Sequence, residues 1–273
     1  MQNLNTYNNF YFVGIGGIGM SALARYFHAA GKNVLGYDKT ETKLTTELQN
    51  EGISISFEDV VDEKFSELNK ENTLVIYTPA IKVLGILDYF NQNGFEVLKR
   101  AKVLGLITEN TECISVAGTH GKTTTSSLVA HLCKVANLPF SGFLGGIAEN
   151  YKSNFIYNGT EISVLEADEY DRSFLNLSPD WAIVTSIDAD HLDIYGDTET
   201  IEQGFRDFAD LVPENDQLFV RKGVKIGRPC KTYAVNEEAD FYSDNFVVEG
   251  EKMILDFNFE GKKEDFFWDV LGI

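Results

Sequence analysis

The sequence predicts an α/β fold that is divided into two domains over its 273 residues. Short apolar runs rich in β-branched residues alternate with segments of helical periodicity, which is typical of parallel sheets covered by helices. Two of the predicted strand-to-helix turns, at residues 14–19 and 118–121, are rich in glycine. From about residue 216 onward, short strands separated by turns replace the helical pattern and indicate a small antiparallel sheet.

The first domain, predicted to span residues 1–107, opens with a strand at residues 10–13. The segment 14–19 fits the pattern G-x-G-x-x-G, and the helix and strand that follow it lead to Asp38. This order is that of a Rossmann-like domain, in which the glycine turn approaches phosphates and the acid binds a ribose. The candidate contacts to a nucleotide or nucleotide-sugar are Gly16, Gly17, Ile18, Gly19 and Asp38. In the alternative interpretation, these glycines only permit close packing of strand against helix.

The rest of the first domain continues the alternation, with strands predicted at residues 53–57, 74–77 and 95–98. Thr78 lies at the carboxyl end of the second of these, where ligands bind in open α/β sheets. It is therefore a candidate substrate contact, although Thr-Pro is also ordinary turn chemistry. Arg100, at the start of the next helix, either reaches a phosphate or is only solvated.

The second domain, predicted over residues 108–273, begins with a strand at residues 114–117 and a loop that leads into a helix. Loop amides, the positive end of the helix dipole and a lysine together make an anion site, here for a nucleoside triphosphate. The strict Walker pattern requires glycine where Val116 stands, so the loop is a shortened relative of the P-loop. The alternative is an ordinary strand-turn-helix unit. The candidate ATP-binding residues are Gly118, Thr119, His120, Gly121, Lys122, Thr123 and Thr124.

Two further buried-type strands end in groups that can bind divalent metals. One ends at Glu166, and the other, at residues 181–187, is followed by His191. Because the carboxyl ends of parallel strands share one edge of a sheet, these two groups are expected to converge with Lys122. Together with the Thr123 hydroxyl they form a candidate Mg²⁺ site. The sequence does not separate the roles of the neighbouring acids Asp168, Glu169, Asp188, Asp190 and Asp193.

The net charge of -19 is concentrated in the second domain. Residues 1–107 carry 10 basic and 12 acidic side chains, whereas residues 108–273 carry 13 and 30. Such acidity excludes a nucleic-acid backbone as the expected partner. A polyphosphate bound in this domain needs local cations, so a divalent metal is expected beside Lys122.

The chain shows no run of 18 apolar residues and no secretory leader, so we expect neither membrane insertion nor secretion. Its three cysteines, Cys113, Cys133 and Cys230, lack the spacing of metal ligands. Cys113 and Cys133 fall on segments of core character, where we expect buried free thiols. A reducing cytoplasm is the expected compartment.

Four segments together resemble the Mur ligases of peptidoglycan synthesis. They are the glycine turn with Met20 and Ser21, the loop over residues 117–124, and the acidic motifs at residues 166–169 and 188–193. The family's own ATP loop accounts for the departure from the Walker spacing. Four motifs in the family's order over most of the chain make the resemblance specific. It is strongest to the members that attach L-alanine to UDP-N-acetylmuramate.

The resemblance implies an ATP-dependent reaction that contributes to cell-wall biogenesis, cell shape and cell division. A substrate carboxylate would attack the γ-phosphate of ATP, and the alanine amine would then displace phosphate from the resulting acyl phosphate. The charge gathered in both steps must be neutralised by positioned cations. UDP-N-acetylmuramate, L-alanine, ATP and Mg²⁺ would be the ligands, and neither nucleic acid nor membrane would be a partner.

By resemblance, Lys122 would hold the β- and γ-phosphates of ATP. Thr123 and Glu166 would bind one Mg²⁺, and His191 would bind a second metal. These assignments make Lys122, Glu166 and His191 the expected catalytic residues, with the loop from Gly118 to Thr124 around the phosphates. The residues implied to hold the UDP-sugar are Gly16, Gly17, Ile18, Gly19, Asp38 and Thr78.

The chain departs from the family pattern in two respects. Many members carry asparagine where this chain has Ser186. The family also has three domains, of which the third brings the amino acid and closes over ATP. We therefore expect this chain to be a fragment of the first two domains that binds its UDP-sugar and ligates nothing.

Two other functions remain open from the sequence. In a dehydrogenase or sensor, residues 14–19 and Asp38 would bind NAD, but Lys122, Glu166 and His191 would have no role. In a non-catalytic ATP-binding switch, the second domain would be explained and the first would not.

Overall fold

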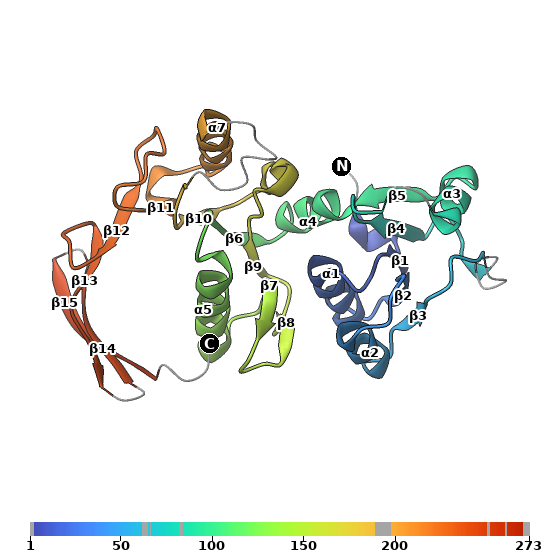
Figure 1. The fold of residues 1–273 in the computed structure, drawn as a ribbon, viewed down its shortest axis with the longest axis horizontal. Coiled ribbons are helices and arrows are strands. Elements are labelled where there is room, and N and C mark those ends of the chain that lie inside the picture. The colour runs from blue at the N-terminus through green and yellow to red at the C-terminus, as the bar shows by residue number, and fades with distance from the viewer. Residues whose placement is uncertain are drawn as a thin grey trace.

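The computed structural model describes residues 3–269 apart from residues 62–64, 66, 82–83, 189–197, 250–251 and 260. It contains two sheets, one in each half of the molecule, with helix α4 (Arg100–Thr108) between them (Figure 1). The short helix η1 (Leu4–Thr6) precedes the first sheet. The α/β class predicted from the sequence is confirmed.

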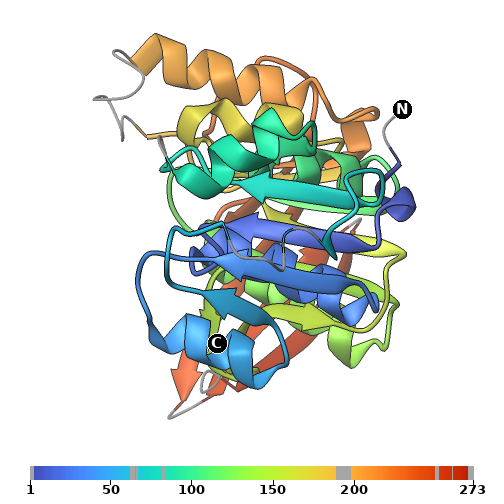
Figure 2. The same cartoon turned by 90° about the vertical axis from the view of Figure 1, so that its right-hand side faces the viewer.

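The first sheet has the strand order β3-β2-β1-β4-β5, and each of its neighbouring pairs is parallel. It faces the viewer in Figure 2. Its strands are β1 (Asn9–Val13), β2 (Asn33–Tyr37), β3 (Ser54–Ser56), β4 (Thr73–Tyr77) and β5 (Glu96–Lys99). Its helices are α1 (Ile18–Ala29), α2 (Lys43–Asn50) and α3 (Gly85–Gln92).

Both faces of the first sheet are buried, as β1 shows. Phe10 and Phe12 lie in a core that includes α1, where Phe10 stacks on Phe27 with ring centroids 3.7 Å apart. Tyr11 lies in a different core, with its ring 4.9 Å from that of Phe90 in α3. Because successive side chains of a strand point to opposite faces, the apolar run of β1 can fill both cores.

The second sheet has the order β15-β14-β13-β12-β11-β10-β6-β9-β7-β8. Its strands are β6 (Glu112–Ala117), β7 (Phe140–Ala148), β8 (Ser153–Tyr157), β9 (Ile162–Glu166), β10 (Trp181–Val184), β11 (Leu218–Arg221), β12 (Lys231–Val235), β13 (Phe241–Glu249), β14 (Lys252–Phe259) and β15 (Lys262–Asp269). Its helices are α5 (Lys122–Val135), α7 (Thr198–Ala209) and the short η3 (Tyr170–Asn176) and η4 (Asn215–Gln217).

The strands predicted from residue 216 onward extend this second sheet, and only the last of them are antiparallel, so the prediction of a wholly antiparallel sheet there is wrong. Strands β11 and β12 run parallel to β10, and β13 joins β12 in parallel register before the antiparallel pairs β13–β14 and β14–β15 begin. Neither β8 nor α7 was predicted from the sequence. Strand β8 returns antiparallel to β7 at the opposite edge of the sheet.

The two halves meet where α1 packs against β7 and β8. Tyr26 of α1 lies 5.4 Å from the ring of Phe143 in β7 and 6.3 Å from that of Phe155 in β8. Burial raises the pKa of the Tyr26 hydroxyl, because the ionised form would lose its hydration. The domain division between residues 107 and 108 stays a prediction, and α4 spans that point.

The expected burial of two cysteines is confirmed. Cys113 and Cys133 are free and buried, and Cys230 is half-buried. Burial raises the pKa of the Cys113 thiol to about 11. Across the described part of the chain, every helix is too short or too polar to span a bilayer.

Candidate functional site

The glycine turn of the first domain is tied to Asp38. The amide of Gly16 donates to Asp38 Oδ2 over 2.7 Å, and the amide of Thr40 donates to Asp38 Oδ1 over 3.1 Å. A Cβ on Gly16 would lie only 2.8 Å from Asp38 Oδ2, so glycine is needed for this approach. Asp38 therefore holds the turn in shape, and its contact to a ribose stays a prediction.

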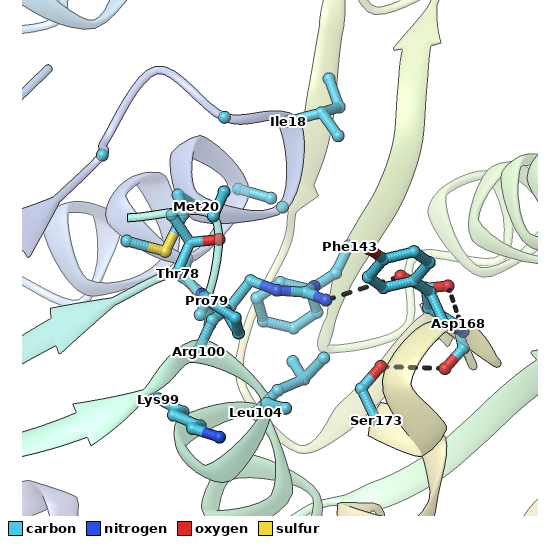
Figure 3. Close-up of a pocket in the computed structure, with 18 of the residues that line it drawn as sticks. Ile18, Met20, Thr78, Pro79, Lys99, Arg100, Leu104, Phe143, Asp168 and Ser173 are labelled. Atoms are coloured by element: carbon cyan, nitrogen blue, oxygen red, sulfur yellow. Dashed lines mark hydrogen bonds and ion pairs between the residues drawn. The ribbon is translucent and has the colours of Figure 1, made fainter. Parts of the chain in front are cut away.

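Arg100, the first residue of α4, lies beside the glycine turn and reaches toward the second domain (Figure 3). Its Nη1 atom would be 2.6 Å from a Cβ on Gly19, and its Nη2 atom is 3.7 Å from Asp168 Oδ2. One cation thus lies between the α1 N-terminus and an acid that follows β9. Thr78 follows β4 and lines the same cavity.

The loop of the second domain has the backbone geometry of an anion site. Gly118 has φ 139° and Gly121 has φ 80°, which are conformations that favour glycine. A Cβ on Gly118 would collide with the Thr185 hydroxyl. Helix α5 begins at Lys122 with Gly121 as its N-cap, so no side chain satisfies its first N–H groups. Those groups and the helix dipole suit a phosphate.

The Lys122 ammonium is held by two groups at the mouth of this loop. Its Nζ atom donates to the Gly118 carbonyl over 2.6 Å and to Glu169 Oε1 over 2.9 Å. The Glu169 side chain is 4% exposed and that of Lys122 is 17% exposed. Glu169 was one of five acids that the sequence could not separate. Its burial and its ion pair with Lys122 now distinguish it.

Ser186, which lies two residues after the end of β10, contacts the same loop. Its hydroxyl accepts a hydrogen bond from the His120 amide over 2.9 Å and lies 2.8 Å from the Thr119 hydroxyl. Thr185 adds a hydrogen bond of 3.1 Å to the Ala117 carbonyl. The residue that departs from the family's asparagine therefore still contacts the loop. Asp188 accepts a hydrogen bond from Thr119 over 3.2 Å.

Glu166, at the end of β9, points toward α5 and β7. Its Oε1 atom accepts hydrogen bonds from the Gly145 amide over 2.7 Å and from the Ser126 hydroxyl over 3.3 Å. Thr123 adjoins the next residue of β7, since a Cβ on Gly146 would be 3.3 Å from Thr123 Cγ2. The Ser126 hydroxyl also lies 3.2 Å from the Thr123 carbonyl, so one side chain of α5 contacts both Thr123 and Glu166.

The third predicted ligand, His191, lies outside the described residues, as do Asp190 and Asp193. The described part of the chain contains no cluster of three or more His, Cys, Asp or Glu side chains placed to hold a metal ion. Strands β9 and β10 flank β6 and run parallel to it, so these three strands end at one edge of the sheet, as expected. The convergence of His191 with Lys122 and Glu166 stays a prediction.

One cavity of about 1270 Å³ extends from the glycine turn of the first domain to Lys122, the first residue of α5 in the second. From the first domain it is lined by Gly17, Ile18, Gly19, Asp38, Thr78 and Arg100. From the second it is lined by Lys122, Gly145, Glu166, Asp168 and Ser173. The arrangement can hold two anionic ligands end to end.

Comparison with known proteins agrees with this arrangement. Residues 9–111 match the "Mur ligase family, catalytic domain", and residues 116–272 match the "Mur ligase middle domain". The chain belongs to the Mur ligase family. Relatives include the UDP-N-acetylmuramate–L-alanine ligases of Flavobacterium psychrophilum, 51% identical, and Christiangramia forsetii, 47% identical. These matches cover 93% and 94% of this chain and 57% of each relative.

Solved structures show the same Mur ligase fold. The UDP-N-acetylmuramate-alanine ligase of Thermotoga maritima has a TM-score of 0.80 at 26% identity, over 97% of this chain and 61% of that one. A Neisseria meningitides UDP-N-acetylmuramate:L-alanyl-gamma-D-glutamyl-meso-diaminopimelate ligase has a TM-score of 0.79 at 23% identity, over 97% of this chain and 89% of that one. The second likeness concerns the fold alone. The chain thus spans little more than half the length of its curated relatives.

Proposed function

We propose that this chain supplies the UDP-sugar-binding and ATP-binding domains of a ligase that joins L-alanine to the carboxylate of UDP-N-acetylmuramate. The reaction proceeds through an acyl phosphate, which the alanine amine attacks with release of phosphate. It serves peptidoglycan precursor synthesis. The free thiols fit a reducing compartment, so the proposal includes a cytoplasmic location.

The observation that carries the proposal is the shared cavity. A reaction between the γ-phosphate of one nucleotide and a carboxylate carried by another requires that the two binding loops open toward each other. The glycine turn before α1 and Lys122, which directly follows the loop before α5, line the same cavity, together with Arg100. Two nucleotide sites that acted independently would not need to share a cavity.

The residues present fit MgATP. The loop offers backbone N–H groups, the α5 N-terminus and the Lys122 ammonium, which suit a triphosphate. Thr123 and Glu166 offer the oxygen ligands that Mg²⁺ prefers, and this ion usually completes its shell with phosphate oxygens and water. Two protein ligands are therefore sufficient. When bound, Mg²⁺ neutralises charge on the transferring phosphoryl group.

We assign the chain's own groups as follows. Lys122 holds the β- and γ-phosphates, and Thr123 with Glu166 binds the metal. His191 is assigned to a second metal by family resemblance. The first-domain residues assigned to the UDP-sugar are Gly16, Gly17, Ile18, Gly19, Asp38, Thr78 and Arg100, of which Asp38 acts by shaping the glycine turn.

Calorimetric titration with UDP-N-acetylmuramic acid, with NAD as the control ligand, tests the proposal. We expect binding of the UDP-sugar and none of NAD. Binding of NAD alone would favour a dehydrogenase or sensor. A chain that binds MgATP and neither of these ligands would favour an ATP-dependent switch.

A further inference from the structure

One buried side chain of the second domain reaches the helix that carries the glycine turn of the first. Asn154, in β8, is 0% exposed. Its Nδ2 atom donates to the Ile18 carbonyl over 2.6 Å and to the Ser21 hydroxyl over 2.9 Å. Both acceptors lie in the first turns of α1, and Ile18 also lines the shared cavity.

The oxygen atom of the Asn154 amide is also hydrogen-bonded. Its Oδ1 atom accepts a hydrogen bond from Nη1 of Arg25, a residue of α1 that is 6% exposed. Arg25 in turn donates to Glu51, from Nε over 2.9 Å and from Nη2 over 2.7 Å. A continuous hydrogen-bond network therefore runs from the end of α2 through α1 to β8 and back to the start of α1.

This hydrogen-bond network fixes the direction in which the N-terminus of α1 points. A helix N-terminus binds an anion through N–H groups whose direction is that of the helix axis. Buried polar groups are costly to leave unpaired, so the network permits few other arrangements of α1 against β8. The aromatic contacts of Tyr26 with β7 and β8 lie one turn further along α1 and add apolar burial.

We propose that Asn154 is a positioning residue for the nucleotide-sugar site, supplied by the ATP-binding domain. The inference rests on the proposed function for the identity of the ligand. Asn154 does not line the cavity and acts through Ile18 and Ser21. The ligand class is a nucleoside diphosphate sugar, whose diphosphate the α1 N-terminus would receive.

The chemistry explains why an amide is needed at this position. The side chain must donate to Ile18 and Ser21 while it accepts from Arg25. Aspartate could keep the Arg25 contact but has no N–H group for the Ile18 carbonyl, and alanine would lose both. Asn154→Asp therefore removes the hydrogen bonds to Ile18 and Ser21, whereas Asn154→Ala also removes the hydrogen bond from Arg25.

The test measures two properties of the purified chain with Asn154→Asp and Asn154→Ala. The first is the Kd for UDP-N-acetylmuramic acid against that for MgADP. The second is hydrogen exchange at the amides of residues 18–22 without ligand. We expect a Kd for the UDP-sugar about tenfold weaker, from the loss of hydrogen bonds that hold the helix N-terminus. The Kd for MgADP should stay within about twofold, and exchange at residues 18–22 should accelerate.

Asn158→Ala is the matched control. Asn158 follows β8, and its amide donates to the Leu138 carbonyl over 2.7 Å, within the second domain. This variant should leave both Kd values and the exchange of residues 18–22 unchanged.

Unchanged exchange at residues 18–22 in both Asn154 variants would overturn the proposal, whichever ligand the site binds. Equal weakening of UDP-sugar and MgADP would also overturn it, since that pattern indicates general loss of structure. If the wild-type chain bound no UDP-sugar while the exchange still accelerated, the positioning role would stand and the proposed substrate would be wrong.

Discussion

At the scale of one residue, Lys122 shows how the charge of a lysine is balanced within an acidic domain. Its ammonium lies between the Gly118 carbonyl and the buried Glu169 carboxylate, so the second domain's excess of acid is locally balanced. A buried charge without a partner would be strongly destabilising. A triphosphate would supply a stronger partner for the same ammonium.

We expect Lys122→Ala in the complete enzyme to lower the ligation rate by about a hundredfold or more, because a positioned cation is lost from the phosphoryl transfer. UDP-sugar binding should be unchanged. Steady-state ADP release and calorimetry measure the two effects. Lys134→Ala, at the other end of α5, is the control. Wild-type turnover in Lys122→Ala would remove Lys122 from the site.

Thiol reactivity also belongs to the residue scale. Burial raises the pKa of Cys113 to about 11, so almost none of it is thiolate near neutral pH. Cys230 is half-buried. Iodoacetamide at pH 8 should therefore alkylate Cys230 first, and Cys113 only as the pH approaches its pKa or the chain unfolds. Peptide mass spectrometry follows each site, and equal rates at Cys113 and Cys230 would contradict the buried placement.

At the scale of elements, each binding loop depends on a close approach between a turn and a neighbouring strand. The turn before α1 is tied to Asp38 after β2, and the loop before α5 is tied to Thr185 and Ser186 after β10. In both places glycine permits an approach that a Cβ would block. Each loop therefore keeps its conformation through contacts with residues that follow a neighbouring strand of the same sheet.

Gly118→Ala should lower the free energy of unfolding by about 2–3 kcal/mol, because a strained φ adds to the collision with Thr185. Gly31→Ala is a matched comparison, since Gly31 has φ 76° and no atom within 4 Å of an added Cβ. Gly31→Ala should lower the free energy of unfolding by only about 1 kcal/mol, because it adds backbone strain without a collision. Urea unfolding of both variants measures the difference. Equal costs would show that the Thr185 contact does not constrain the loop.

The whole molecule brings the glycine turn of the first domain and Lys122 of the second domain to one cavity. The interface of α1 with β7 and β8 sets their relative position, through the Asn154 network and the Tyr26 contacts. The residues around the cavity come from segments more than 140 positions apart, such as Gly19 and Glu166. Only the packed pair of domains contains this site.

We expect residues 1–273 by themselves to bind UDP-N-acetylmuramic acid without ligating L-alanine. They correspond to 57% of the length of the relatives in the comparison, and family resemblance assigns amino-acid binding to a third domain. Coupled measurement of ADP release with and without L-alanine tests this. Alanine-dependent ADP release from these residues alone would contradict it.

The sequence by itself determined the α/β class, the two glycine loops and the parallel strands that end beside Lys122 and Glu166. These features are local, because turn geometry and strand periodicity depend on neighbouring residues. It also pointed to the Mur ligase family through four ordered motifs. Its prediction that Asp38 contacts a ribose stays a prediction, and in the structure both Asp38 oxygens accept backbone N–H groups.

Only the tertiary structure decided which acid pairs with Lys122, what Ser186 contacts and how the domains meet. Glu169, Ser186 and Asn154 gave no distinguishing signal, since each acts on a partner 47 to 136 positions away. The physical reason is that hydrogen-bond direction and burial depend on packing between elements, which periodicity does not encode. The sequence thus determined the loops, and the packing of α1 on β8 brought the first loop to one cavity with Lys122 and Glu166.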